Sequence, residues 1–256
     1  MSDQADRAAL APKQPFGDIK TSNDNILQEA TVRCPCPQCG KTVKFFCYKC
    51  YQVVGMSQSD VPRLRLPVHL DVIKHEQEVD GKSTAIHARI IAPEDVDILT
   101  WSSMSSYKQN NDDESSRTLL LFPGPDAKTL DEIPRESFDR VVVIDGTWKQ
   151  AKKIVRETPG LHRMRKVTME PRQTNFWRFQ QLSENYLATI EAIYYLYREY
   201  ATSYETKEYD HRYDDLMYFY CFFYKLIQDN YRQHKEKKFT SRHKANYIQY
   251  DSEENK

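Results

Sequence analysis

"RVVVIDGTWKQAKKIVRE", residues 140–157, carries the clearest indication of the fold class in this chain. Its first six residues form a nearly continuous β-branched run, which is typical of a strand buried on both faces of a parallel sheet. The period then changes, because Ala151, Ile154 and Val155 fall on one side of a helix. Thr147 and Gln150 have the spacing of a capping box at the start of that helix. A buried strand leading directly into a helix predicts an α/β domain.

The segments on either side of this stretch repeat the same types of pattern. Strand-like segments are "LPVHLDVIKH" (66–75), "AIHARIIA" (85–92), "VDILTW" (96–101), "TLLLFPGPD" (118–126) and "HRMRKVTM" (162–169). Two helices are expected near the C-terminus. The first has apolar residues at helical spacing from Ile190 to Tyr197, and the second (214–231) is apolar on nearly all sides and is expected to be buried.

Changes in residue composition along the sequence divide the chain into four regions. We expect a disordered N-terminus (1–30), a cysteine module (31–55), a main α/β domain (56–238) and a disordered tail (239–256). Residues 102–117 are predicted to be a polar surface loop. The longest apolar run (216–224) is far shorter than the ~20 residues of a membrane span, and residues 1–30 lack the pattern of a signal peptide. Neither membrane insertion nor secretion is therefore expected.

The cysteine module contains five of the six cysteines, between Cys34 and Cys50, and four of them form two CxxC pairs. In a chain with no signal-peptide pattern, such clustering favours a metal over disulfides. Each pair can bind one side of a tetrahedral ion, and Gly40 permits the first turn. The predicted ligands of a structural Zn²⁺ are Cys36, Cys39, Cys47 and Cys50. Cys34 either replaces a ligand or is inert, and Cys221 is expected in the core.

The net charge of the chain is +0, which by itself predicts no nucleic-acid partner. Between residues 140 and 182, however, ten Lys and Arg residues stand against three acidic residues, so this stretch carries a charge of +7. A local basic field inside a neutral chain indicates a surface that binds a polyanion. The alternative is a basic face that is only solvated.

The turn formed by Asp145, Gly146, Thr147 and Trp148 joins the predicted strand to its helix. In parallel sheets, ligands bind beyond the carboxyl ends of the strands, and a helix N-terminus offers free N–H groups there. Asp145 is placed to accept a proton or to hold an ammonium or hydroxyl group. Alternatively, Asp145 and Thr147 only cap the helix, and Trp148 packs in the core.

The helix after this turn carries a basic stripe, because four cations recur at i, i+3, i+4 and i+7. A row of cations beside a candidate site suits a phosphodiester backbone. Further along, Phe176, Trp177 and Phe179 lie among arginines, where aromatic rings either stack on exposed bases or belong to the core. The predicted RNA-binding residues are Lys149, Lys152, Lys153, Arg156, Arg172 and Arg178.

Several motifs, in this order along the chain, resemble those of the DTW-domain family, the tRNA-uridine aminocarboxypropyltransferases. "VVVIDGTWKQAKKI" resembles the DxTW signature, and "LLLFPGPDA" resembles the proline-glycine loop. "RLPVHLDVIKH" and "GKSTAIHARIIAP" resemble the early strand-rich segment of the family. "LATIEAIYYL" resembles its Ser-Thr-x-Glu-Ala helix, with Ala188 in place of the usual serine. With the CxxC pairs, the resemblance spans roughly residues 33–232 and is closest to a eukaryotic branch.

The resemblance implies a fold related to the SPOUT RNA methyltransferases, an α/β domain with a trefoil-knotted donor site, here with an N-terminal zinc ribbon and C-terminal helices. It also implies S-adenosylmethionine as donor and a D-loop uridine of tRNA as acceptor, giving 3-(3-amino-3-carboxypropyl)uridine. The donor-binding residues that it implies are Thr84, Pro123, Gly124, Asp145, Gly146, Thr147, Trp148, Thr189 and Glu191. The hydroxyl missing at Ala188 makes a donor contact there doubtful.

Asp145 is the expected catalytic residue, either as the base for the uridine N3 proton or as the group that orients the donor. Three rival hypotheses are an RNA methyltransferase that uses the same donor, a related enzyme acting on ribosomal RNA, and a non-catalytic zinc-ribbon RNA-binding protein. The basic run at 232–244 suggests a nuclear location, with a cytoplasmic one as the alternative. No obligate protein partner is inferred.

Overall fold

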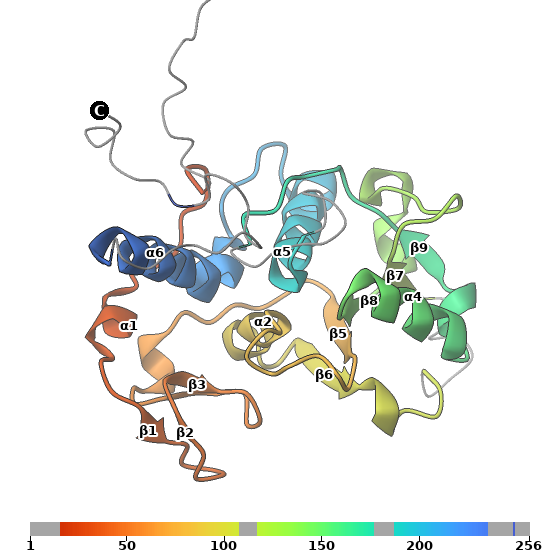
Figure 1. The fold of residues 1–256 in the computed structure, drawn as a ribbon. Coiled ribbons are helices and arrows are strands. Elements are labelled where there is room, and N and C mark those ends of the chain that lie inside the picture. Colours follow the sequence, from red (N-terminus) through yellow and green to blue (C-terminus); the bar gives the residue numbers. More distant parts are fainter. Residues whose placement is uncertain (1–15, 108–116, 177–186, 235–247, 249–256) are drawn as a thin grey trace, which may run out of the picture.

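A five-stranded parallel sheet forms the centre of the computed structural model, which describes residues 16–107, 117–176, 187–234 and 248 (Figure 1). The strand order is β6-β5-β8-β7-β9, and every neighbouring pair is parallel. The strands are β5 (His69–Lys74), β6 (Val96–Thr100), β7 (Thr118–Leu121), β8 (Arg140–Asp145) and β9 (Arg165–Val167). The predicted α/β class is confirmed.

Strand β8 occupies the middle of the sheet, as its β-branched sequence predicts. It pairs with β5 along its whole length, so that Lys74 lies opposite Asp145 at the carboxyl end. Helix α4 (Trp148–Glu157) follows through the expected capping box. The Thr147 Oγ1 accepts from the Gln150 backbone N–H at 3.4 Å, and the Gln150 Oε1 accepts from the Thr147 N–H at 2.7 Å.

One strand prediction is wrong, because residues Ala85–Ile91 form helix α2. Six of the seven residues in α2 are buried, so the segment has no polar face to give a periodic signal. A short run of this kind fits a buried strand and a buried helix equally well. Topology decides between them, because the parallel neighbours β5 and β6 need a crossover connection between them, and α2 provides it.

Helices cover both faces of the sheet. Ile154 and Val155 of α4 pack with Ile73, Leu120 and Val142 on one face. Helices α2, α5 (Thr189–Tyr200) and α6 (Tyr218–Gln233) share the other, larger core. The single turns are η1 (Gln58–Asp60), η2 (Trp101–Ser103), η3 (Leu130–Glu132), η4 (Arg135–Ser137), η5 (Leu161–Arg163), η6 (Ala201–Glu205) and η7 (Asp214–Met217).

The cysteine module consists of two small antiparallel hairpins, which pack against the helices on this side of the sheet (Figure 1). The strands are β1 (Cys34–Pro35), β2 (Thr42–Val43), β3 (Phe45–Cys47) and β4 (Gln52–Val54). Phe45 contacts the ring of Phe222 on α6 with centroids 5.2 Å apart, and Phe46 contacts Phe219 at 5.0 Å. The hairpins are therefore joined to the main core by aromatic packing.

Residues 16–30, assigned above to a disordered N-terminus, have a defined structure. They include helix α1 (Asn25–Glu29), whose Leu27 is buried. The Lys20 N–H donates to the Asp214 carboxylate at 2.6 Å, and Phe16 packs edge-to-face on Tyr224. The polar composition of the segment misses these contacts, because they are made with residues nearly 200 positions away.

Several predictions fall on residues that the structure does not describe. These are 1–15, most of the 102–117 loop, Trp177, Arg178 and Phe179, most of the basic run at 232–244, and nearly all of the 239–256 tail. Across the described ranges, no helix has both the length and the hydropathy that a membrane span requires.

His87, on α2, leads to a prediction about acid stability. It is buried among Phe46, Phe219 and Phe223, and its Nδ1 has no hydrogen-bond partner among the described residues. Burial lowers the pKa of His87 to about 3. The unfolded chain binds a proton near pH 6.5, so stability is fully present above that pH and is lost as pH falls.

Between about pH 7 and about pH 5, His87 should therefore lower the free energy of unfolding by about 2 kcal/mol. Urea unfolding of the wild type and of His87→Leu at both pH values measures this contribution of His87 to the free energy of unfolding. Because other titrating groups are common to both proteins, the variant should lose less stability on acidification than the wild type. Equal losses in the two proteins would show that His87 is not the cause.

Candidate functional site

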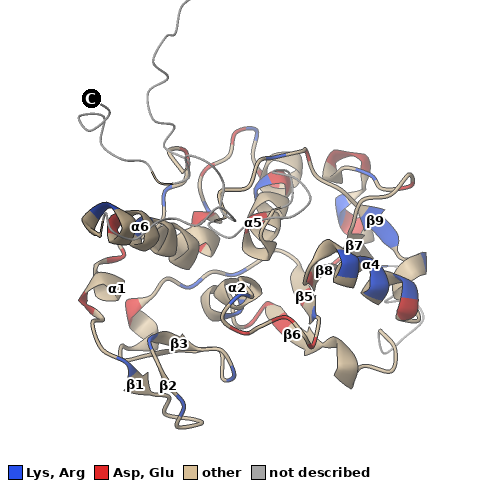
Figure 2. Ribbon diagram, in the orientation of Figure 1, with Lys and Arg blue, Asp and Glu red and all other residues tan. Residues whose placement is uncertain are grey.

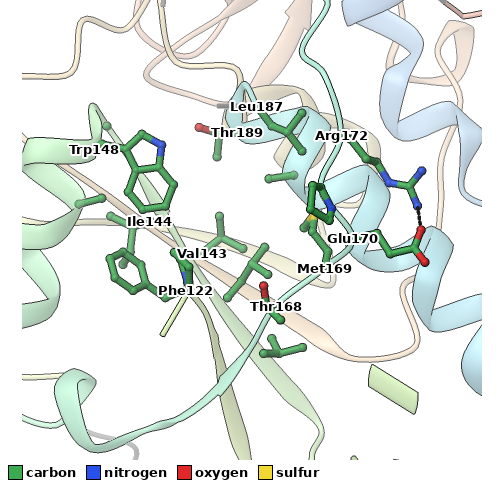
Figure 3. A pocket seen from close by; sticks show the side chains of 17 residues that line it. Phe122, Val143, Ile144, Trp148, Thr168, Met169, Glu170, Arg172, Leu187 and Thr189 are labelled. Atoms are coloured by element: carbon green, nitrogen blue, oxygen red, sulfur yellow. Dashed lines mark ion pairs between the residues drawn. The ribbon is translucent and has the colours of Figure 1, made fainter. Parts of the chain in front are cut away.

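A pocket of about 240 Å³ opens at the carboxyl ends of β7, β8 and β9, beside the turn that the sequence singles out (Figure 3). Its walls come from the ends of these strands, the first turn of α4, the segment after β9 and the start of α5. The lining residues are Leu121, Phe122, Pro123, Val143, Ile144, Gly146, Trp148, Ala151, Val167, Thr168, Met169, Glu170, Pro171, Arg172, Leu187, Thr189 and Ala192.

One side of the pocket is aromatic. Trp148 and Phe122 lie together with ring centroids 5.6 Å apart (Figure 3). Trp148 is only half-buried and lines the pocket, so it is not a simple core residue. Val143 and Ile144 line the pocket beside these rings, and Met169 lines it nearer to Glu170 (Figure 3). An apolar cleft with a few polar groups is the usual form of a small-molecule site.

Asp145 lies just behind this wall and is 2% exposed. Its two carboxylate oxygens accept hydrogen bonds from separate hydroxyl groups, Ser83 Oγ at 2.6 Å and Thr189 Oγ1 at 2.5 Å. Burial raises the pKa of Asp145, while these two hydrogen bonds and the charge of Lys74 oppose the rise. Asp145 therefore joins the loop before α2 and the start of α5 to the end of β8.

Thr189 connects Asp145 to the pocket. A hydroxyl group has one proton, and that of Thr189 is donated to Asp145. The lone pairs of Thr189 Oγ1 remain available to accept from an N–H or O–H group of a ligand. Thr189 lines the pocket whereas Asp145 does not. The carboxylate thus acts on a ligand through this threonine.

Two of the predicted donor-binding residues hold the scaffold together. The Thr84 hydroxyl accepts from the Ile190 N–H at 3.1 Å. Glu191 is buried and accepts from Thr174 Oγ1 at 2.5 Å and from the Ala188 N–H at 2.7 Å. Burial raises the pKa of Glu191, and its hydrogen bonds oppose this. Both side chains therefore fix the start of α5, and neither is among the residues that line the pocket.

The remaining predicted residues divide between the pocket and its surroundings. Pro123 and Gly146 line the pocket, whereas Thr147 caps α4 and Gly124 is exposed on the loop after β7. A Cβ at Gly146 would lie 3.0 Å from the Gln150 Oε1 and 3.3 Å from the His75 Cβ, so a larger residue would require these side chains to shift. Ser83 was not predicted; its position next to Thr84 was the only signal in the sequence.

The other side of the pocket is charged. Glu170 and Arg172 lie together on the segment that follows β9 (Figure 3). The Arg172 Nη2 is 3.7 Å from the Glu170 carboxylate and 3.1 Å from that of Glu199 on α5. Arg172, predicted as an RNA contact, thus lies at the wall of the pocket and apart from the stripe on α4.

The basic stripe itself lies on the solvent side of α4, where Lys149, Lys152, Lys153 and Arg156 are all exposed (Figure 2). Lys153 lies over the ring of Trp101, 5.1 Å from its centroid, and Arg156 pairs with Glu157. Phe176 belongs to the core, because it stacks on Tyr220 with ring centroids 6.2 Å apart.

The four predicted metal ligands converge, with the Sγ atoms of Cys36, Cys39, Cys47 and Cys50 all within 4.8 Å of one another. Four thiols this close, without a disulfide between them, can hold one metal ion. Gly40 has a φ of +71°, the conformation that the first CxxC turn needs. Cys34 is not part of this group, and Cys221 is buried in the core as predicted.

Comparisons with known proteins match most of the chain. The family model described as "DTW domain" matches residues 44–228. tRNA-uridine aminocarboxypropyltransferase 1 of Xenopus tropicalis is 33% identical, over 83% of this chain and 86% of the relative. The proteins of that name in Mus musculus and Homo sapiens are 32% and 31% identical, covering 86% and 88% of both chains. No solved structure matches.

Proposed function

This chain belongs to the DTW domain family, and we propose that it transfers the 3-amino-3-carboxypropyl group of S-adenosylmethionine to N3 of a tRNA uridine. The observation that carries the proposal is the pocket beside the Asp145–Trp148 turn, which resembles the DxTW signature and lies within the matched range 44–228. Gly146 and Trp148 of this turn line the pocket. The names of the relatives supply the reaction, the nucleoside and the class of RNA.

In this reaction the uridine N3 loses its proton to solvent and forms a bond to the methylene carbon beside the sulfonium. The carbon–sulfur bond breaks, and methylthioadenosine leaves. Because charge is neutralised along the way, the protein has mainly to bring the two reactants together in the correct orientation. The choice between methylene and methyl carbon is likewise a matter of how the donor is held.

The side chains around the pocket suit this task. Trp148 and Phe122 offer an aromatic surface for the adenosine part of the donor. Asp145 fixes the Thr189 hydroxyl at the pocket wall and leaves its oxygen able to accept a hydrogen bond. We therefore assign Asp145 a positioning role rather than that of a base in contact with uridine, because it is buried behind the pocket wall and holds the Ser83 and Thr189 hydroxyl groups.

We propose that the stripe formed by Lys149, Lys152, Lys153 and Arg156 binds the phosphates of tRNA. The stripe begins at the residue after Trp148, so a backbone held there lies next to the pocket. Each phosphate contact releases counterions, which makes the affinity depend on salt concentration.

Replacing Lys152 and Lys153 with Ala should weaken tRNA binding and lower the salt slope of the logarithmic binding constant by about 1.4 to 1.8 in total. Filter binding over a series of salt concentrations measures the slope. Lys207→Ala serves as the control, because Lys207 is an exposed lysine that follows η6 and does not belong to the stripe on α4. A slope equal to that of the wild type would mean that the stripe is only solvated.

We also propose that the metal held by the four cysteines is Zn²⁺ with a structural role. Tetrahedral coordination by four thiolates leaves no open position for catalysis. The packing of Phe45 and Phe46 on α6 supports this role, because it links the metal site to the main core.

For the fold, we propose the trefoil knot of the SPOUT type that the family resemblance implies. Such knots are rare and need a specific path of the chain. The proposal is supported by the sheet order, in which β5 and β8 are neighbours, and by the segment after β9, which enters the same pocket as the end of β7. An experimental structure traced through residues 177–186 tests it, and an unknotted trace would refute it.

The proposed function is tested most simply in cells that lack this protein. Nucleoside analysis of their tRNA should find 3-(3-amino-3-carboxypropyl)uridine missing from the affected tRNAs and restored by the wild-type gene. A missing methylated nucleoside would instead identify a methyltransferase, and an unchanged nucleoside profile would favour a non-catalytic RNA-binding role.

A further inference from the structure

Glu170 and Arg172 are two charged side chains at the pocket, and the proposed reaction so far assigns them no role. Of the described residues that line the pocket, only these two have ionisable side chains. They lie on one side of it, whereas Trp148 and Phe122 lie on the opposite side (Figure 3). The pocket therefore has an aromatic end and an end that carries both a positive and a negative charge.

We propose that this pair binds the amino-acid end of the donor, with Glu170 accepting from the ammonium group and Arg172 donating to the carboxylate. The inference rests on the proposed function, because it concerns the same site and donor. S-adenosylmethionine has a matching distribution of groups, an aromatic nucleoside at one end and a zwitterion at the other. The zwitterion is part of the group that is transferred, so holding it would select the aminocarboxypropyl carbon for reaction.

The ion pair between Glu170 and Arg172 is weak enough for both side chains to bind such a ligand instead. They are 3.7 Å apart, and the Glu170 side chain is 78% exposed. A loose ion pair with one exposed partner contributes little to stability, so exchanging it for a ligand costs little. A more tightly held pair would have to lose buried hydrogen bonds first.

Arg172 is held in place by two residues of α5. Its Nη2 donates to Glu199 at 3.1 Å, and its guanidinium lies over the ring of Tyr195, 4.4 Å from the centroid. Its Nε is buried and has no hydrogen-bond partner among the described residues. A buried N–H group without a partner costs free energy, and a ligand carboxylate would satisfy it.

Two nucleosides test this assignment independently of turnover. S-adenosylhomocysteine has the amino-acid end, whereas methylthioadenosine has the same adenosine and sulfur without it. Calorimetry should show that Arg172→Gln and Glu170→Gln each weaken S-adenosylhomocysteine binding by ~10-fold or more, since each loses a charge-assisted hydrogen bond. The affinity of methylthioadenosine should stay within about twofold of the wild type. Arg163→Gln, an exposed arginine outside the pocket, should change neither.

Methylthioadenosine also reports whether the pocket of each variant is folded. Equal losses for both nucleosides, or no loss for S-adenosylhomocysteine, would overturn the assignment. If Arg172→Gln fails to fold, Arg172→Lys keeps the charge but not the planar guanidinium, and it should lose affinity for S-adenosylhomocysteine alone. A wild-type protein that binds neither nucleoside would refute the proposed donor itself. Wild-type binding with unaffected variants would refute only the roles of Glu170 and Arg172.

Discussion

Asp145→Asn is expected to lower the rate of tRNA modification by at least ~100-fold while the protein stays folded. The carboxylate accepts from Ser83 at 2.6 Å and from Thr189 at 2.5 Å. An amide has a single acceptor oxygen, so one of the two hydroxyl groups must turn away or donate elsewhere. If Thr189 turns, the pocket loses a fixed hydrogen-bond acceptor for the donor, and small misplacements of the reactants lower the rate strongly.

Single-turnover assays with tRNA, together with far-UV circular dichroism, measure this effect. Thr189→Val should reproduce most of the loss, because it removes the hydroxyl with little change in shape. Thr189→Ser keeps the hydroxyl and should retain most of the activity. An Asp145→Asn protein that modifies tRNA at the wild-type rate would exclude Asp145 from the reaction.

Cys47→Ser is expected to lower the free energy of unfolding by more than about 4 kcal/mol, the range in which loss of a structural metal falls. Cys47 is fully buried, and its Sγ is 3.6 Å from that of Cys39. It follows Phe45 and Phe46 in β3, which pack against α6. Without the ion, the two hairpins lose the interaction that orders them, and this aromatic contact is weakened.

Urea unfolding and the zinc content of the purified protein test this expectation. Cys34→Ser is the matched control, because Cys34 lies outside the group of four thiols. It should keep the full metal content and lose less than about 1 kcal/mol, as is usual for a substitution away from core and metal sites. A Cys47→Ser protein as stable as the control would contradict a structural role for the metal.

The sequence predicts the centre of the fold well, because local and long-range signals agree there. Strand β8 and the capping box of α4 depend on residues close together in the chain, from Val141 to Gln150. The CxxC pairs are similarly local, and their thiols meet as their spacing predicts. The prediction of a strand at α2 is wrong because a buried strand and a buried helix would bury the same side chains of this segment. Only the parallel pairing of β5 with β6 distinguishes the two structures.

The parts of the candidate site that the sequence does not reveal depend on contacts between distant segments. Ser83 meets Asp145 across 62 positions, and Arg172 meets Glu199 across 27. Apart from the position of Ser83 next to Thr84, nothing in the local sequence separates Ser83 or Glu199 from ordinary surface residues. The ordered segment at 16–30 was missed for the same reason, because it is held by Asp214 and Asp215 of the C-terminal region.

Transfer of the aminocarboxypropyl group is tested most directly by isotope labelling of the donor. Purified protein is incubated with unmodified tRNA and S-adenosylmethionine labelled either in its carboxyl carbon or in its methyl group. We predict that the carboxyl label enters a tRNA uridine and that the methyl label remains with methylthioadenosine. Methyl label in the tRNA, or carboxyl label absent from it, would contradict the account.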